Sequence, residues 1–139
     1  MVSTPTDRKI ALPLLLLRLS VFLVMLMWAI DKFVQPDHAA AVFEKFYYIG
    51  GLGYGLIYLL GAIQLAVLIG FVLGIKKRFT YGAILLFHTI STVSSFRQFL
   101  NPYEGPNLLF FAAWPMLAAC FTLFYLRDLD RLGVIKGLA

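Results

Sequence analysis

A stripe of polar side chains interrupts the apolar segment FHTISTVSSF, residues 87–96. His88, Ser91, Thr92 and Ser95 follow one another at intervals of three or four residues, which places them on one face of a helix. An imidazole can donate and accept hydrogen bonds and exchange a proton near neutral pH. The stripe therefore fits hydrogen bonding to a polar group of a bound molecule. It fits equally well with hydrogen bonds between neighbouring helices, worth about 0.6 kcal/mol each in a membrane.

Charged side chains lie inside and beside other apolar segments. Arg18 lies within the first apolar run, Asp31 and Lys32 lie near its end, and Arg97 lies at the end of the third run. Charges in a bilayer are costly unless they are paired. We therefore predict an ion pair between Asp31 and Arg97, which reach the same end of the predicted helices. Arg18 either belongs to a binding site or extends its long side chain to the membrane surface.

Three more polar or sulfur-containing side chains should lie at the depth of His88. Counting the helical rise of about 1.5 Å per residue, Gln64, Met116 and Cys120 reach a similar level. Met116 and Cys120 are four residues apart, a spacing that would let them bind copper(I) together with His88. Methionine and cysteine are also ordinary core residues, and the sequence favours that interpretation over a metal site. Because Cys120 is the single cysteine, an internal disulfide is excluded.

These residues belong to a chain with the composition of a membrane protein. Of 139 residues, 61% are hydrophobic and 14% are charged, whereas globular chains have about 25% charged residues. Four apolar runs, over about 11–33, 52–73, 79–97 and 107–126, approach the length that crosses a bilayer. Spans in lipid must satisfy their own backbone groups and are therefore helices. The sequence predicts an all-α fold: one integral membrane domain over 1–139, built as a four-helix transmembrane bundle.

The distribution of basic residues predicts the orientation of this bundle. With four spans both termini share one side, and that side carries eight basic residues: Arg8, Lys9, Lys76, Lys77, Arg78, Arg127, Arg131 and Lys136. The opposite side carries three: Lys32, Lys45 and Arg97. The positive-inside rule then places both termini on the cytoplasmic side of a bacterial-type inner (plasma) membrane. The lipid bilayer is therefore a predicted partner of the protein. The net charge of +5 therefore reflects the membrane topology. The sequence has no basic stripe with interleaved aromatic residues, the pattern that would indicate binding to nucleic acid.

The connections between the runs contain further signals. Residues 35–51, QPDHAAAVFEKFYYIGG, carry Val42, Phe43 and Phe46 at helical spacing after Asp37, a suitable N-cap. This pattern favours a short helix in the membrane interface over an extended connector. Pro115, inside the last run, is expected to kink its helix.

Three segments resemble the DoxX-like family of membrane proteins. Arg18-Leu19 followed by Lys32-Phe33 is similar to the family's first helix, GAIQLAVLIGFVLGIKKRF (61–79) to its second, and LRDLDRLG (126–133) to its closing segment. Gln64 stands where the family commonly has an acidic residue, and Ala29 replaces a frequent glycine. The resemblance implies four membrane helices and an association with quinone-dependent sulfur or thiol oxidation.

The residues and the resemblance together give one leading functional hypothesis. It is a redox-associated inner-membrane subunit that binds a quinone in an apolar slot between the helices. The donors would be His88 and either Arg18 or Arg97, and Trp28 and Tyr54 would form aromatic walls. Asp31, Lys32, Gln64, Ser91 and Ser95 complete the candidate site. A redox partner protein would exchange the electrons. The alternatives are a protein that binds or transports another small molecule, and a structural subunit; the oligomeric state stays open.

Overall fold

The computed structural model describes residues 4–138, and every regular element in that range is a helix. In chain order these are α1 (Pro5–Val34), α2 (Pro36–Tyr47), α3 (Tyr54–Val72), α4 (Lys77–Ser94), α5 (Phe96–Leu100), the 3-10 helix η1 (Asn107–Ala112) and α6 (Ala113–Tyr125). The all-α prediction is confirmed for this range.

The ends of α1 follow from local sequence chemistry. Thr4 and Asp7 form a capping box, in which the Thr4 hydroxyl accepts from the Asp7 amide at 3.2 Å and the Asp7 carboxylate accepts from the Thr4 amide at 2.9 Å. The helix ends at Val34, because the residue before a proline disfavours the helical conformation. Pro36 then begins α2, so the N-cap is Gln35 rather than the predicted Asp37.

Three helices within residues 4–138 are long and apolar enough to cross a membrane. They are α1, α3 and the continuous segment Asn107–Tyr125 formed by η1 and α6. The remaining long helix, α4, contains Lys77, Arg78, His88 and several hydroxyl side chains, which lower its mean hydropathy. The sequence and the structure agree on a chain with several membrane-type helices.

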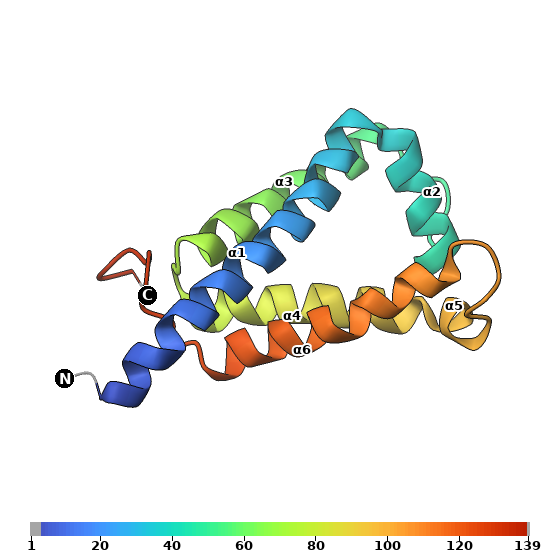
Figure 1. The fold of residues 1–139 in the computed structure, drawn as a ribbon. Coiled ribbons are helices and arrows are strands. Elements are labelled where there is room, and N and C mark those ends of the chain that lie inside the picture. The colour runs from blue at the N-terminus through green and yellow to red at the C-terminus, as the bar shows by residue number, and fades with distance from the viewer. Residues whose placement is uncertain (1–3, 139) are drawn as a thin grey trace.

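The long helices form two antiparallel pairs, α1 with α3 and α4 with α6 (Figure 1). The pairs converge at the end of the molecule that holds both termini and diverge toward the other end, where α2 lies across the opening. The helix predicted within residues 35–51 is therefore present, and it contacts α1, α3 and α4. We call the two ends the converging end and the wide end.

The core lies along the facing sides of the two pairs. All four long helices contribute to it, with these buried side chains: Leu14, Val21, Met25, Ala29, Leu68, Phe71, Tyr81, Ile84, Cys120 and Leu123. Helices α1 and α3 approach closely at Gly61, where an added Cβ would lie 2.7 Å from the Phe33 ring. Pro115 lies in the first turn of α6, where its missing N–H costs no helical bond, and the helix changes there from 3-10 to α.

The segment after α6 folds back onto the turn between α3 and α4. The Ile135 amide donates to the Leu73 carbonyl at 3.0 Å, and the Lys76 amide donates to the Leu138 carbonyl at 2.7 Å. The C-terminal segment (residues 126–138) is therefore part of the packed converging end.

Candidate functional site

A buried ion pair lies at the converging end. One guanidinium nitrogen of Arg18, Nη1, is 3.0 Å from Oδ2 of Asp130, and the two side chains are 1% and 0% exposed. Arg18 belongs to α1 and Asp130 to the C-terminal segment, so this pair joins the two ends of the chain. Arg18 therefore points into the protein, where its side chain is buried.

Tyr81 of α4 completes this ion pair as a hydrogen-bonded triad. Its hydroxyl donates to Asp130 Oδ2 at 2.8 Å and accepts from Arg18 Nη1 at 3.2 Å. Two backbone carbonyls are also bound: Arg18 Nη2 donates to Leu132, and Lys77 Nζ donates to Asp130 at 2.7 Å. Burying two charges is tolerated only when their remaining groups are also satisfied. In the described residues Arg18 Nε and Asp130 Oδ1 have no partner, so the network is nearly but not fully satisfied.

Sequence reasoning found Arg18 but missed Tyr81, Lys77 and Asp130. The polar stripe of α4 contained a signal for two of them, because Lys77 and Tyr81 extend the face of His88 toward the start of the helix, and all three are buried. Asp130 gave no such signal. It lies among Arg127, Asp128 and Arg131, and such a run of charged residues is typical of an exposed surface segment.

His88 is buried between α4 and α6, with 8% of its surface exposed. Its Nε2 lies 2.9 Å from the Ala113 carbonyl oxygen. A carbonyl only accepts, so Nε2 carries the hydrogen, and in the neutral ring Nδ1 is then an acceptor. The Nε2–Ala113 bond is the hydrogen bond that the structure shows for this ring within residues 4–138, and Nδ1 is not among the buried atoms that lack a partner there. His88 therefore faces the interior of the protein, and its hydrogen-bond partner is the Ala113 carbonyl.

The hydroxyls of the stripe bond to their own helix. Thr92 donates to the His88 carbonyl at 2.8 Å, and Ser95 donates to the Ser91 carbonyl at 3.1 Å. Thr92 and Ser95 are buried and Ser91 is half-buried, so the stripe faces the protein as expected. Short hydroxyl side chains commonly satisfy themselves in this way. Hydrogen bonds from these hydroxyls to other helices, one sequence interpretation, do not occur in the described part of the chain.

The remaining residues predicted at the depth of His88 are divided between the two helix pairs. Gln64 Nε2 of α3 is 3.4 Å from the Met25 carbonyl of α1, whereas Met116 and Cys120 pack in the core from α6. Within residues 4–138 no three His, Cys, Asp or Glu side chains converge as metal ligands would. The polar bonds of Gln64 and His88 thus each hold one pair together.

Asp31 lies at the wide end and pairs with a different residue from the predicted one. Its carboxylate is 2.8 Å from Nδ1 of His38, on α2. The ring of His38 stacks on Trp28 with the centroids 6.4 Å apart. The predicted Asp31–Arg97 pair is therefore wrong, because α2 brings a local partner to Asp31. The Arg97 guanidinium lies 5.6 Å from the centre of the Tyr48 ring, as a cation–π contact.

Two further candidates also form contacts at the wide end. Lys32 Nζ donates to the Trp28 carbonyl at 3.0 Å, and the Tyr54 hydroxyl donates to Asp37 at 2.6 Å. The candidate residues therefore form three groups: Arg18 at the converging end, His88 with Gln64 in the middle, and Trp28 with its neighbours at the wide end. No family model, curated protein or solved structure matches the chain.

Proposed function

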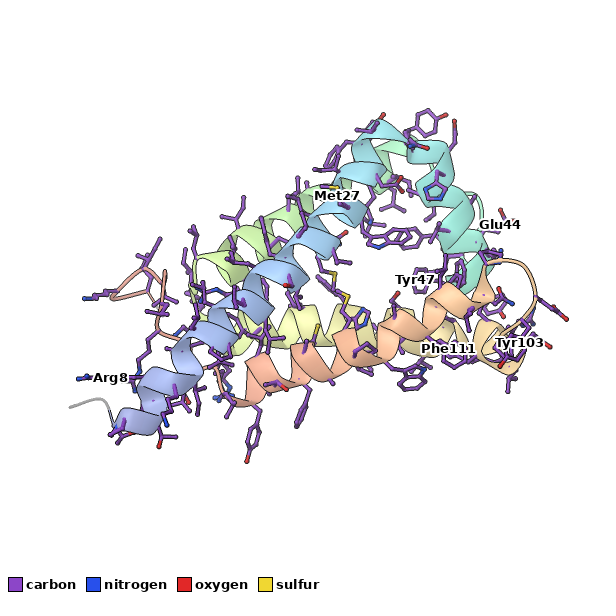
Figure 2. All side chains as sticks on the ribbon, in the orientation of Figure 1. Arg8, Met27, Glu44, Tyr47, Tyr103 and Phe111 are labelled. Atoms are coloured by element: carbon purple, nitrogen blue, oxygen red, sulfur yellow. The ribbon has the colours of Figure 1, made fainter. Side chains whose placement is uncertain are left out.

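We propose that the chain is a multi-pass protein of a bacterial-type inner membrane, with both termini in the cytoplasm. Its four spans would be α1, α3, α4 and η1–α6. The distribution of charge supports this orientation, because eight basic residues lie on the terminal side and three on the other. Figure 2 shows Arg8 at the converging end and Tyr103 at the opposite end of the molecule.

The two faces of α4 support its role as the fourth span. Large apolar side chains on one side, Leu86, Ile90 and Val93, are exposed. The polar side chains His88 and Thr92 are buried on the other. This division suits a helix that turns its apolar face to lipid and its polar face to the protein. The lower mean hydropathy of α4 then reflects inward residues.

We expect cysteine labelling to report this topology. In Glu104→Cys, an impermeant maleimide should label intact spheroplasts, because the 101–106 loop would be external. In Lys9→Cys, labelling should require lysis. The unsubstituted protein is the control, since Cys120 is 2% exposed and should not react under either condition. Protection of Glu104→Cys before lysis would contradict the proposed orientation.

We propose further that the protein binds a quinone-class molecule at His88. The observation that carries this proposal is the state of the imidazole: the ring is 8% exposed, and its Nε2 is fixed by the Ala113 carbonyl at 2.9 Å. This bond leaves Nδ1 as the ring nitrogen that can bond a ligand. A membrane-soluble molecule with a hydroxyl or carbonyl group offers the matching hydrogen-bonding group.

The protonation chemistry of His88 fits both forms of such a molecule. Neutral, Nδ1 accepts a hydrogen bond from a quinol hydroxyl; protonated, it donates to a quinone carbonyl. Bound, the quinone would supply two-electron redox chemistry. The chain's own contribution would be to orient one oxygen and exchange its proton at Nδ1. A partner protein would exchange the electrons.

The proposed redox association comes from the resemblance to the DoxX-like family. Two of the similar segments, Arg18-Leu19 and LRDLDRLG, contain the two partners of the buried ion pair at the converging end. The ion pair requires the charged residue of each segment. The proposal of an oxidoreductase subunit rests on that resemblance.

Substitution of His88 tests the proposed site. We expect His88→Leu to remain folded in detergent but to retain roughly five- to tenfold less quinone than the native protein, as expected for one lost hydrogen bond. Quinone is extracted from gently purified protein and measured by mass spectrometry. Thr89→Val is the matched control, because Thr89 is on the same helix and bonds only the Leu85 carbonyl.

The other outcomes exclude the quinone site. Equal retention by His88→Leu and Thr89→Val would remove His88 from it. A native protein that retains a different small molecule, lost in His88→Leu, would favour binding or transport of that molecule. If His88→Leu lowers thermal stability and neither protein retains a molecule, the histidine is structural.

A further inference from the structure

An open hollow of about 750 Å³ lies at the converging end, outside the buried ion pair. Its size is in the range of pockets that bind small molecules. Two parts of the chain line it, the start of α4 and the segment after α6. The lining residues are Lys76, Lys77, Arg78, Phe79, Arg127, Asp128, Arg131, Val134, Lys136 and Gly137. We call it the basic hollow.

The basic hollow gathers more positive than negative side chains. Six of its residues are basic and one, Asp128, is acidic. The ion pairs Arg18–Asp130 and His38–Asp31 do not include a residue of the hollow. Like charges held at one place repel one another unless an anion binds.

The fold holds these cations together and does not merely allow them to meet. The backbone bonds from Ile135 to Leu73 and from Lys76 to Leu138 dock the C-terminal segment beside the start of α4. Arg127 is fixed by its bond to the Phe124 carbonyl at 2.8 Å, and Arg131 by its bond to the Asp128 carbonyl at 3.1 Å. Lys77 is fixed by its bond to Asp130 at 2.7 Å. Backbone bonds between distant segments and the Lys77–Asp130 bond therefore bring the two parts of the site together, while Arg127 and Arg131 are held by local bonds.

We propose that the basic hollow binds the phosphate headgroup of an anionic phospholipid. The inference rests on the membrane orientation proposed above, which places the hollow at the anionic cytoplasmic leaflet, where clusters of four to eight basic residues recognise acidic lipids. Arginine and lysine are the usual phosphate ligands. Phe79, 73% exposed, lines the hollow and offers an apolar contact for the glycerol and acyl part. A free phosphate would make no use of Phe79.

Native mass spectrometry of the full-length protein in a neutral detergent tests this proposal. We expect the native protein to bind phosphatidylglycerol in preference to zwitterionic phosphatidylcholine. The double variant Arg78→Gln/Arg131→Gln should bind phosphatidylglycerol roughly 30-fold more weakly, because each basic residue near an acidic lipid contributes about fivefold. Lys9→Gln/Lys45→Gln removes the same charge outside the hollow and should keep native affinity.

Three results would overturn the proposal. The first is equal binding of the two lipids by the native protein. The second is an equal loss of phosphatidylglycerol affinity in the two double variants. The third is stabilisation of the native protein by inorganic phosphate alone. In the last case, phosphate would raise the melting temperature of the native protein but not of Arg78→Gln/Arg131→Gln, and the site would belong to a free phosphate. The maleimide labelling does not depend on lipid binding. A wrong orientation would therefore change the labelling, whereas an unoccupied hollow would change only the lipid binding seen by mass spectrometry.

Discussion

Replacing Asp130 with leucine is expected to lower the free energy of unfolding by about 3–5 kcal/mol. The substitution strands the Arg18 guanidinium, 1% exposed, without its carboxylate, and it also removes the acceptor of the Tyr81 hydroxyl. A buried charge without a counter-charge is among the largest single-residue losses known. The measurement is reversible unfolding of the detergent-solubilised protein, followed by circular dichroism.

A double-mutant cycle separates the pair from general damage. Arg18→Leu/Asp130→Leu should lose less than Asp130→Leu alone, because neither member of the pair then remains buried without its partner. Asp128→Leu is the matched control: Asp128 is two residues away and exposed, and its loss should change stability by no more than about 0.5 kcal/mol. Purely additive losses in the cycle would show that Arg18 and Asp130 do not depend on each other.

Replacing Gly74 with alanine is expected to destabilise the protein by more than the 1–2 kcal/mol that a left-handed conformation costs an L-residue. Gly74 has φ +67° in the turn between α3 and α4, and an added Cβ would lie 2.4 Å from Cγ1 of Val134. Val134 must therefore move, and the C-terminal segment that carries Asp130 must move with it. Thermal unfolding in detergent gives the magnitude.

Gly105 provides a control with the same backbone conformation and no contact. Its φ is +51°, and no atom lies within 4 Å of an added Cβ, so Gly105→Ala should show the backbone cost alone. The excess loss in Gly74→Ala then measures the contact with Val134. Adding Val134→Ala should recover part of that excess. Equal losses in Gly74→Ala and Gly105→Ala would mean that the C-terminal segment is not tightly docked.

Both predictions concern the converging end, which connects the two proposed sites. His88 lies further along the same face of α4 as Tyr81, and the basic hollow lies beside Lys77 at the start of that helix. The position of α4 therefore depends on the contacts of Arg18 and Asp130. Variants of the ion pair should weaken both quinone retention and lipid binding, whereas His88→Leu should affect only the first.

The sequence by itself determined the features that depend on local pattern. Apolar length predicted membrane-type helices, and three-to-four spacing predicted that His88, Thr92 and Ser95 face inward, as they do. The spacing of Val42, Phe43 and Phe46 predicted the helix α2. Each of these follows from hydrophobic periodicity, which acts within one helix and needs no knowledge of its neighbours.

Only the tertiary structure decided which polar groups meet. Charge signs permitted Asp31 to pair with Arg97, yet α2 supplies His38, seven residues away in the sequence. Nothing in the periodicity of α1 pointed from Arg18 to Asp130, because that partner belongs to an irregular segment that is docked by its own backbone bonds. Helical patterns fix the face on which a side chain lies. The partner of a buried charge depends on the packing of distant segments, since a charge can be satisfied by any suitable group that the fold brings within reach.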